Sequence, residues 1–362
     1  MYSTWCGLGL TYDSHDYLAA AKSFYESGLL INKNGQAFIV HSPLLPILIS
    51  GLGQNPLAML RIMNLLFFTG TMIIFRELVV KNIRNEILRW CVYFAIVFAV
   101  GIHMIYNFVW SEPLFLFLFA FHNWFLIKYL KREKSKDLWI LILLAFCMGI
   151  TRNAGFFIIL SSFLILFFTK KIRKPVTLYY FILGASGFAA WNMYTFFIQG
   201  GIVKFREGLS LFTGIGLNFR NYLDIISAWI LPPFLPLVFR IILVFLLISF
   251  SIMKFKIRRI TMEGKVFFFQ SAVYTFMLIM FISVYKSDVE RYMAVIYPWI
   301  FIGIFIILDT WILRFSKLFN RLLIVLICCW LSYVCARTIK NSVMWHKSNS
   351  TSMIIQTSNL TD

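Results

Sequence analysis

The sequence predicts an all-α fold, a polytopic bundle of about ten transmembrane helices, and three observations support it. Hydrophobic residues make up 60% of the 362 residues and charged residues only 14%, whereas a soluble domain has roughly 25% charged residues. Mean hydropathy is +0.80. Many apolar runs approach the ~20 residues that a helix needs to cross the hydrocarbon core, and they are too long and too apolar for barrel strands.

The formal net charge of +19 is spread over the short loops between the apolar runs. In a soluble protein such a charge would suggest a nucleic-acid partner. Lys and Arg clusters between spans are instead typical of topology signals and of contacts with anionic lipid head groups. We therefore expect membrane lipids and no nucleic acid as partners. The six cysteines have no regular spacing, so they predict neither a disulfide framework nor a zinc site.

The first segment outside the membrane, 11–54, is predicted to carry short helices. Apolar residues at helical spacing predict an amphipathic helix over 15–27, and Gly28 suits its C-cap. Asn34-Gly35 predicts a tight turn. The apolar run 47–52 is too short to cross a bilayer, so we expect a helix lying at the interface.

The spans alternate with basic and less basic loops, which sets their orientation. The ten predicted spans cover about 55–77, 88–108, 113–130, 138–151, 154–169, 176–198, 226–253, 265–284, 293–313 and 322–338. Every second loop is rich in Lys and Arg and is predicted to be cytoplasmic by the positive-inside rule. The external segments are then 1–54, 109–112, 152–153, 199–225, 285–292 and 339–362.

Residues 138–169 are predicted to form two short spans rather than one long helix. A single helix would place the basic loops 128–136 and 170–174 on opposite sides of the membrane. A hinge at Thr151-Arg152-Asn153 keeps both loops in the cytoplasm. Arg152 then lies at or just below the external interface, where an arginine costs a few kcal/mol unless it is paired or hydrated.

One transmembrane domain over residues 1–338 accommodates all of these spans, with 11–54 as its first external loop. The external loop 199–225 is Gly-rich and aromatic, which suits a cover over a site or a contact with head groups. Residues 339–362 are polar and are expected to form a flexible external tail.

Several short motifs occur in the same order as in a known membrane family. They are Asp13-Ser14-His15-Asp16-Tyr17 with His41-Ser42-Pro43, then Arg61-Ile62-Met63-Asn64, Ser111-Glu112-Pro113, Arg152-Asn153-Ala154-Gly155, and Glu290-Arg291-Tyr292 with Pro298. Together they resemble the GT-C glycosyltransferases, polytopic enzymes similar to protein O-mannosyltransferases and to the lipid A aminoarabinose transferase. The resemblance extends over about residues 11–300, with Ser14 where the family often has Glu.

The resemblance implies transfer of a sugar from a polyprenyl or dolichyl phosphate, with inversion, to an acceptor hydroxyl at the external face. The acceptor is a lipid, a glycan or a protein. No cofactor is expected, and a divalent metal is left open. Members of the family have a span before the first loop, and residues 1–10 are too short to form it, so the chain is expected to lack that span. The implied location is the bacterial plasma membrane.

Asp13 matches the acidic residue of the family's first loop and is the candidate general base. Transfer needs a base for the hydroxyl proton and cations for the leaving phosphate. The competing interpretation makes Asp13 the N-cap of the helix that follows, a position that Asp and Ser favour. Asp16 is the second candidate base, and its spacing from Asp13 places both on one helix face.

Arg152 and Arg291 are the candidate ligands of the leaving phosphate, because the guanidinium fork matches phosphate oxygens and stays charged. Both residues lie at span ends, where snorkelling to the interface is the simpler interpretation. Lys286 is a possible helper or a loop charge, and Tyr292 accompanies Arg291 in the family motif.

Arg61, Glu112 and His41 complete the candidate binding residues. Arg61 lies inside a predicted span, so it is functional by default or pairs with Glu112. Glu112 precedes Pro113 at a helix start, a position that favours acids without any further role. His41 is a candidate acceptor ligand, although a lone histidine before a proline is more often structural.

Two other classes of function remain open at the level of the sequence. A transporter or a flippase for lipid-linked oligosaccharides would need polar residues near the middle of the membrane. The chain has few of them, chiefly Arg61, Asn64, His122, Asn123 and Arg240. An inactive subunit of the GT-C type is the third class, which the absence of a first span favours.

Overall fold

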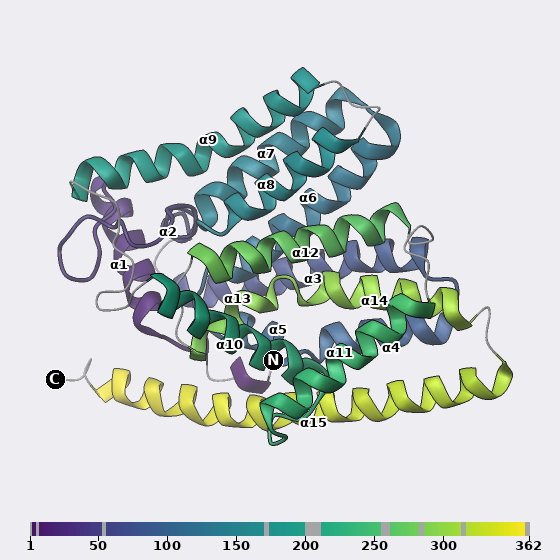
Figure 1. The fold of residues 1–362 in the computed structure, drawn as a ribbon. Coiled ribbons are helices and arrows are strands. Elements are labelled where there is room, and N and C mark those ends of the chain that lie inside the picture. The colour runs from purple at the N-terminus through teal and green to yellow at the C-terminus, as the bar shows by residue number, and fades with distance from the viewer. Residues whose placement is uncertain are drawn as a thin grey trace. The chain divides into compact units, whose positions relative to one another are not determined.

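The computed structural model describes residues 2–4, 7–52, 56–169, 174–199, 211–254, 261–281, 286–312 and 316–358. Within these ranges the chain is helical and forms no β-strand (Figure 1). The elements are η1 (Tyr2–Thr4), α1 (Tyr12–Ser27), α2 (Leu44–Ser50), α3 (Pro56–Asn82), α4 (Glu86–Val97), α5 (Val100–Asn107), α6 (Glu112–Arg132), α7 (Ser135–Thr151), α8 (Gly155–Phe168), α9 (Lys174–Gln199), α10 (Leu211–Ile230), α11 (Leu237–Lys254), α12 (Met262–Phe281), α13 (Lys286–Ala294), α14 (Tyr297–Ile312) and α15 (Lys317–Ser358).

Five helices in the described part of the chain are long and apolar enough to cross a membrane, namely α3, α6, α9, α12 and α15. Two further pairs reach that length only together and are bent, α4 with α5 by 43° and α13 with α14 by 56°. The all-helical membrane fold predicted from composition is therefore supported with five to seven candidate spans, and the number ten is not confirmed.

The structure divides the predicted span 226–253 into two helices. α10 ends at Ile230 and α11 begins at Leu237. Pro232, Pro233 and Pro236 lie in this connection, and proline lacks the amide hydrogen and clashes with the preceding turn of a helix. The same change makes residues 211–225 of the predicted external loop part of α10.

The C-terminal segment also differs from the prediction of a polar tail. α15 continues to Ser358 as one helix of 42 residues. No glycine or proline occurs between Lys317 and Ser358, so no residue of low helix propensity stops the helix after its apolar part.

The helices group into two compact units. The first contains residues 1–76, 103–203 and 339–362, and the second contains residues 77–102 and 204–338. In the first unit α7 packs against α6 and α9, α8 packs against α9, and α1 packs against α2. Figure 1 shows α6, α7, α8 and α9 running side by side.

Small residues bring α7 and α9 close together. A Cβ added at Gly149 of α7 would lie 2.9 Å from the backbone nitrogen of Phe188 in α9. A Cβ added at Gly187 of α9 would lie 2.8 Å from the carbonyl oxygen of Phe146. Close backbone approach over small residues is the usual means of helix association in lipid.

Gly149→Ala is therefore expected to destabilise the protein by about 1–3 kcal/mol, because the added methyl overpacks the α7–α9 contact. Thermal unfolding in detergent measures the effect. Gly216→Ala is the control, since a Cβ at exposed Gly216 in α10 meets nothing within 4 Å, and alanine there stabilises by up to about 1 kcal/mol. Equal melting temperatures for the two variants would contradict the close packing.

In the second unit α12 and α4 pack against α14, and α10 packs against α11, α12 and α13. Asp309 of α14 accepts hydrogen bonds from the backbone nitrogens of Arg84, at 3.1 Å, and Asn85, at 2.8 Å. The Asn85 side chain in turn accepts from the Leu88 nitrogen at 3.1 Å as the N-cap of α4. These bonds satisfy amides at the start of α4, which have no partner within the helix, and tie α4 to α14.

Candidate functional site

The start of α1 does not use the Asp13 side chain as its N-cap. The helix begins at Tyr12 with Thr11 as its N-cap, not at His15 with Asp13 as the cap. The Ser14 hydroxyl accepts from the Thr11 amide at 2.9 Å and donates to the Val109 carbonyl at 3.1 Å. Ser14, the residue that departs from the family pattern, thus both caps the helix and docks it on the chain before α6.

His41 is brought to Asp13 by a return of the chain after α1. Gly28 ends α1 with φ 72°, and Gly35 has φ 76° in the predicted turn, a region that glycine enters without strain. The His41 Nε2 then lies 3.7 Å from the Asp13 carboxylate oxygen Oδ1, and its ring lies 5.0 Å from that of Tyr17. The turn and the C-cap are where the sequence predicted them.

An apolar core holds the segment with α1 and α2 together. α2 covers Leu44–Ser50 rather than 47–52, and it buries side chains in the segment instead of only lying at an interface. The buried members of the core are Leu8, Tyr17, Ala20, Ala21, Phe38, Leu45, Ile49, Leu60 and Val109. The core fixes the positions of the polar groups on α1 and before α2.

The predicted hinge at 151–153 is confirmed and carries Arg152. α7 ends at Thr151 and α8 begins at Gly155. A Cβ at Gly155 would lie 2.3 Å from the Met148 carbonyl oxygen, so this tight connection requires glycine. Arg152 Nη1 donates to the Ser111 hydroxyl at 3.0 Å and forms an ion pair with Glu112.

Hydrogen bonds and ring contacts connect these groups into one polar line. The Tyr17 hydroxyl lies 3.3 Å from the Ser111 hydroxyl, which Arg152 also contacts. The line therefore runs from Asp13 through His41, Tyr17 and Ser111 to the Arg152–Glu112 pair. We call it the external polar line, after the side of the membrane that the charge pattern of the sequence predicts for it. The sequence did not indicate Tyr17 and Ser111 as linking residues, because the two lie 94 positions apart.

Exposure changes along the external polar line. The side chains of Asp13 and His41 are 26% and 20% exposed, whereas those of Arg152 and Glu112 are 9% and 0% exposed. Solvent therefore reaches the carboxylate and the imidazole at one end of the line. The charge of Arg152 is balanced by Glu112, and its observed contacts hold Ser111 and Glu112 in place.

Asp16 and Arg61 lie apart from these contacts. Asp16 is 7% exposed, and its Oδ1 atom has no hydrogen-bond partner among the described residues. Arg61 is exposed on α3. The pairing of Arg61 with Glu112 considered from the sequence is not formed, because Glu112 is paired with Arg152.

The remaining predicted residues belong to the second unit. Arg291 and Tyr292 lie on α13, where Arg291 is 6% exposed and the Tyr292 carbonyl accepts from the Tyr274 hydroxyl at 3.4 Å. Lys286 begins α13, and its side chain lies outside the described residues. That these three residues join Asp13 and Arg152 in one site stays a prediction.

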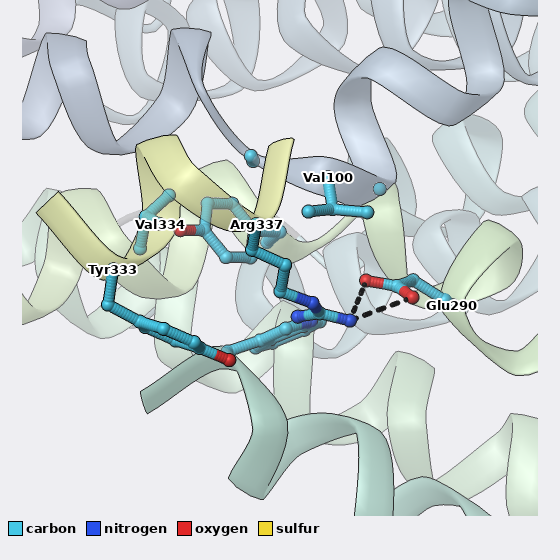
Figure 2. Close-up of a pocket in the computed structure, with 9 residues that line it drawn as sticks. Val100, Glu290, Tyr333, Val334 and Arg337 are labelled. Carbon is cyan, nitrogen blue, oxygen red and sulfur yellow. Dashed lines mark hydrogen bonds and ion pairs between the residues drawn. The ribbon is translucent and has the colours of Figure 1, made fainter. Parts of the chain in front are cut away.

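The second unit also contains a pocket that the sequence did not indicate. Its lining residues are Ala99, Val100, Gly101, Trp229, Glu290, Tyr297, Tyr333, Val334 and Arg337. Figure 2 shows the Arg337 guanidinium, from α15, directed at the Glu290 carboxylate of α13. A signal was present, since Arg337 follows directly after the apolar run 322–336.

In the described ranges, no group of three or more His, Cys, Asp or Glu side chains is close enough to hold a metal ion. Comparison of the chain with protein-family models, with curated proteins and with solved structures found no match. The arrangement of the residues is therefore the basis for a functional proposal.

Proposed function

We propose that the protein is an integral membrane glycosyltransferase of the GT-C type that uses a polyprenyl- or dolichyl-phosphate sugar as its donor. The observation that carries the proposal is the external polar line. It joins a partly exposed carboxylate and imidazole, from the segment before the spans, to a buried arginine at the hinge between α7 and α8. Three of the motifs that resemble the family thus meet in space.

The proposed reaction uses Asp13 as the base. Asp13 takes the proton of the acceptor hydroxyl, the hydroxyl oxygen bonds to the anomeric carbon, and the bond from that carbon to the phosphate oxygen breaks with inversion. His41 lies against Asp13 and orients it. Asp16 is the alternative base. Such a proton transfer contributes about 10²–10⁴-fold to the rate.

The leaving lipid phosphate needs positive charge. Arg291 is the proposed phosphate ligand, with Lys286 and Tyr292 beside it in sequence. Arg152 is proposed to hold Ser111 and Glu112 in place at the edge of the site, and a guanidinium there adds a group that matches phosphate oxygens. Arg61, exposed on α3, is proposed to contact the donor from the membrane side.

The proposal includes a ten-span topology with the external polar line on the outer face of a bacterial plasma membrane. Two structural facts support that sidedness within the first unit. Glu112 begins α6 and Arg152 ends α7, so their ion pair joins helix ends that the charge pattern places on the same side. Ser14 and Tyr17 of the segment before the spans bond to the same end.

A transporter for lipid-linked sugars is the second candidate, and one set of contacts favours it. His122 lies near the middle of α6, is fully buried, and its Nε2 lies 2.9 Å from the Tyr180 hydroxyl of α9. Neighbouring Asn123 is also fully buried. Ionisable groups inside spans often mark transport pathways.

A transfer assay separates the two candidates. Purified protein is incubated with radiolabelled polyprenyl-phosphate sugars and an extract of lipid, glycan and protein acceptors, with a nucleotide sugar as the control donor. We expect label in an acceptor from the lipid-linked donor only. If label stays on the donor, but the donor crosses the bilayer of protein-containing vesicles, the transporter is the correct function.

A further inference from the structure

The Glu290–Arg337 pocket lies where charged residues meet the end of an apolar helix segment. Arg337 follows the apolar run 322–336 of α15, and Lys340 follows one turn later. Only 17% of the most apolar window of α15 is buried in the protein, so this helix contacts lipid. A basic residue that ends such a run sits at the level of the head groups.

The two partners of the ion pair are held differently. Arg337 Nη2 donates to both Glu290 carboxylate oxygens, at 2.9 and 3.1 Å, and Arg337 Nη1 donates to the Ala228 carbonyl at 3.2 Å. The Tyr333 hydroxyl donates to the same carbonyl at 3.0 Å. Arg337 is thus anchored on the end of α10, whereas the bonds that hold the Glu290 carboxylate come from Arg337.

The free volume of the pocket is about 20 Å³, which holds one water molecule. A phosphate group enters only when the Glu290 carboxylate leaves its place. The side chains of Arg337 and Glu290 are 18% and 16% exposed, so both are reached from outside the pocket. Val100, Val334 and the aromatic rings around the pair form apolar walls (Figure 2).

We propose that this pocket binds the phosphate group of an anionic membrane glycerophospholipid, with Arg337 as the ligand and Glu290 as a built-in competitor. A guanidinium binds phosphate through paired hydrogen bonds, and basic pockets between membrane helices take anionic head groups. The occupant proposed is a bulk lipid, because α15 lines the pocket and most of its apolar window is not buried by the protein. The inference does not depend on the proposed sugar transfer.

Lipid binding to the purified full-length chain in detergent tests the proposal. The probes are phosphatidylglycerol, diacylglycerol with the same acyl chains, inorganic phosphate and a polyprenyl phosphate, and native mass spectrometry gives the bound fraction. Glu290→Gln is expected to strengthen phosphatidylglycerol binding about fivefold, because the competing charge is gone. Arg337→Gln is expected to weaken it about fivefold. Diacylglycerol and inorganic phosphate are expected to bind weakly to every variant.

The matched control is Asp224→Asn, which removes the acid from a different arginine pair of the second unit, Arg240 with Asp224. Arg240 keeps the Leu235 carbonyl, at 3.0 Å, as an acceptor in that variant, and lipid binding is expected to stay unchanged. If Arg337→Gln does not fold, Glu290→Gln alone tests the proposal. Phosphatidylglycerol is then expected to raise the melting temperature of Glu290→Gln more than that of the wild type. Equal binding by wild type and Glu290→Gln, or a preference for the polyprenyl phosphate, would overturn the proposal.

Discussion

Asp13→Asn is expected to lower the rate of sugar transfer by about 10²–10⁴-fold. The amide has nearly the same shape as the carboxylate but cannot accept the proton of the acceptor hydroxyl. The Asp13 side chain is 26% exposed and is not the N-cap of α1, so the variant is expected to fold. Initial rates at saturating donor concentration measure the effect, and thermal unfolding shows that the fold is kept.

The control for Asp13 is Glu26→Gln on the same helix. Glu26 lies on the surface, 3.9 Å from Lys22, with both side chains more than half exposed, and such a pair contributes little. Transfer is expected to be unchanged. If Asp13→Asn transfers sugar at nearly the wild-type rate and Asp16→Asn loses most of its transfer rate, then Asp16 is the general base instead of Asp13.

Arg152→Gln is expected to destabilise the protein by about 3–5 kcal/mol. The change leaves the Glu112 carboxylate, whose side chain is 0% exposed, without its cation, and an uncompensated buried charge carries a penalty of this size. Unfolding of the purified protein in detergent, followed by helical circular dichroism, measures the loss. This effect on stability does not depend on the proposed sugar transfer.

The double variant Glu112→Gln, Arg152→Gln shows whether the ion pair is the cause. Replacing both charges removes the unpaired carboxylate, so the double variant is expected to recover most of the stability lost in Arg152→Gln. If the stability losses of the two single variants add up in the double variant, the two side chains act separately. The Arg152–Glu112 ion pair would then not be the buried end of the polar line.

Local signals predicted the parts of the fold that depend on short stretches of chain. The turn at Asn34-Gly35, the end of α1 at Gly28 and the hinge at 151–153 follow from glycine or from the placement of basic loops. The break after Ile230 had an equally local signal in its three prolines, although hydropathy over 226–253 favoured one span. Apolar composition outweighed proline in that prediction.

Partners across long stretches of chain were beyond sequence reasoning. Arg152 lies 41 positions from Ser111, and Arg337 lies 47 positions from Glu290. Both arginines look alike in sequence, since each ends an apolar segment, and snorkelling explains either one equally well. Only the packing of α7 against α6, and of α10 against α13, shows which helix ends come together around a charge.

The docking of α1 onto residues 109–111 has a consequence for biosynthesis. Ser14 and Val109 are 95 positions apart, and Tyr17 and Ser111 are 94 apart. At about 5–20 residues per second a ribosome needs roughly 7–28 s to reach Arg152 after Asp13. At first the nascent N-terminal segment lacks residues 109–111, against which α1 packs. Until the end of that interval it also lacks the buried Arg152. The segment is therefore incomplete when chaperones and proteases first meet it, and ribosome stalling before the hinge would leave it exposed.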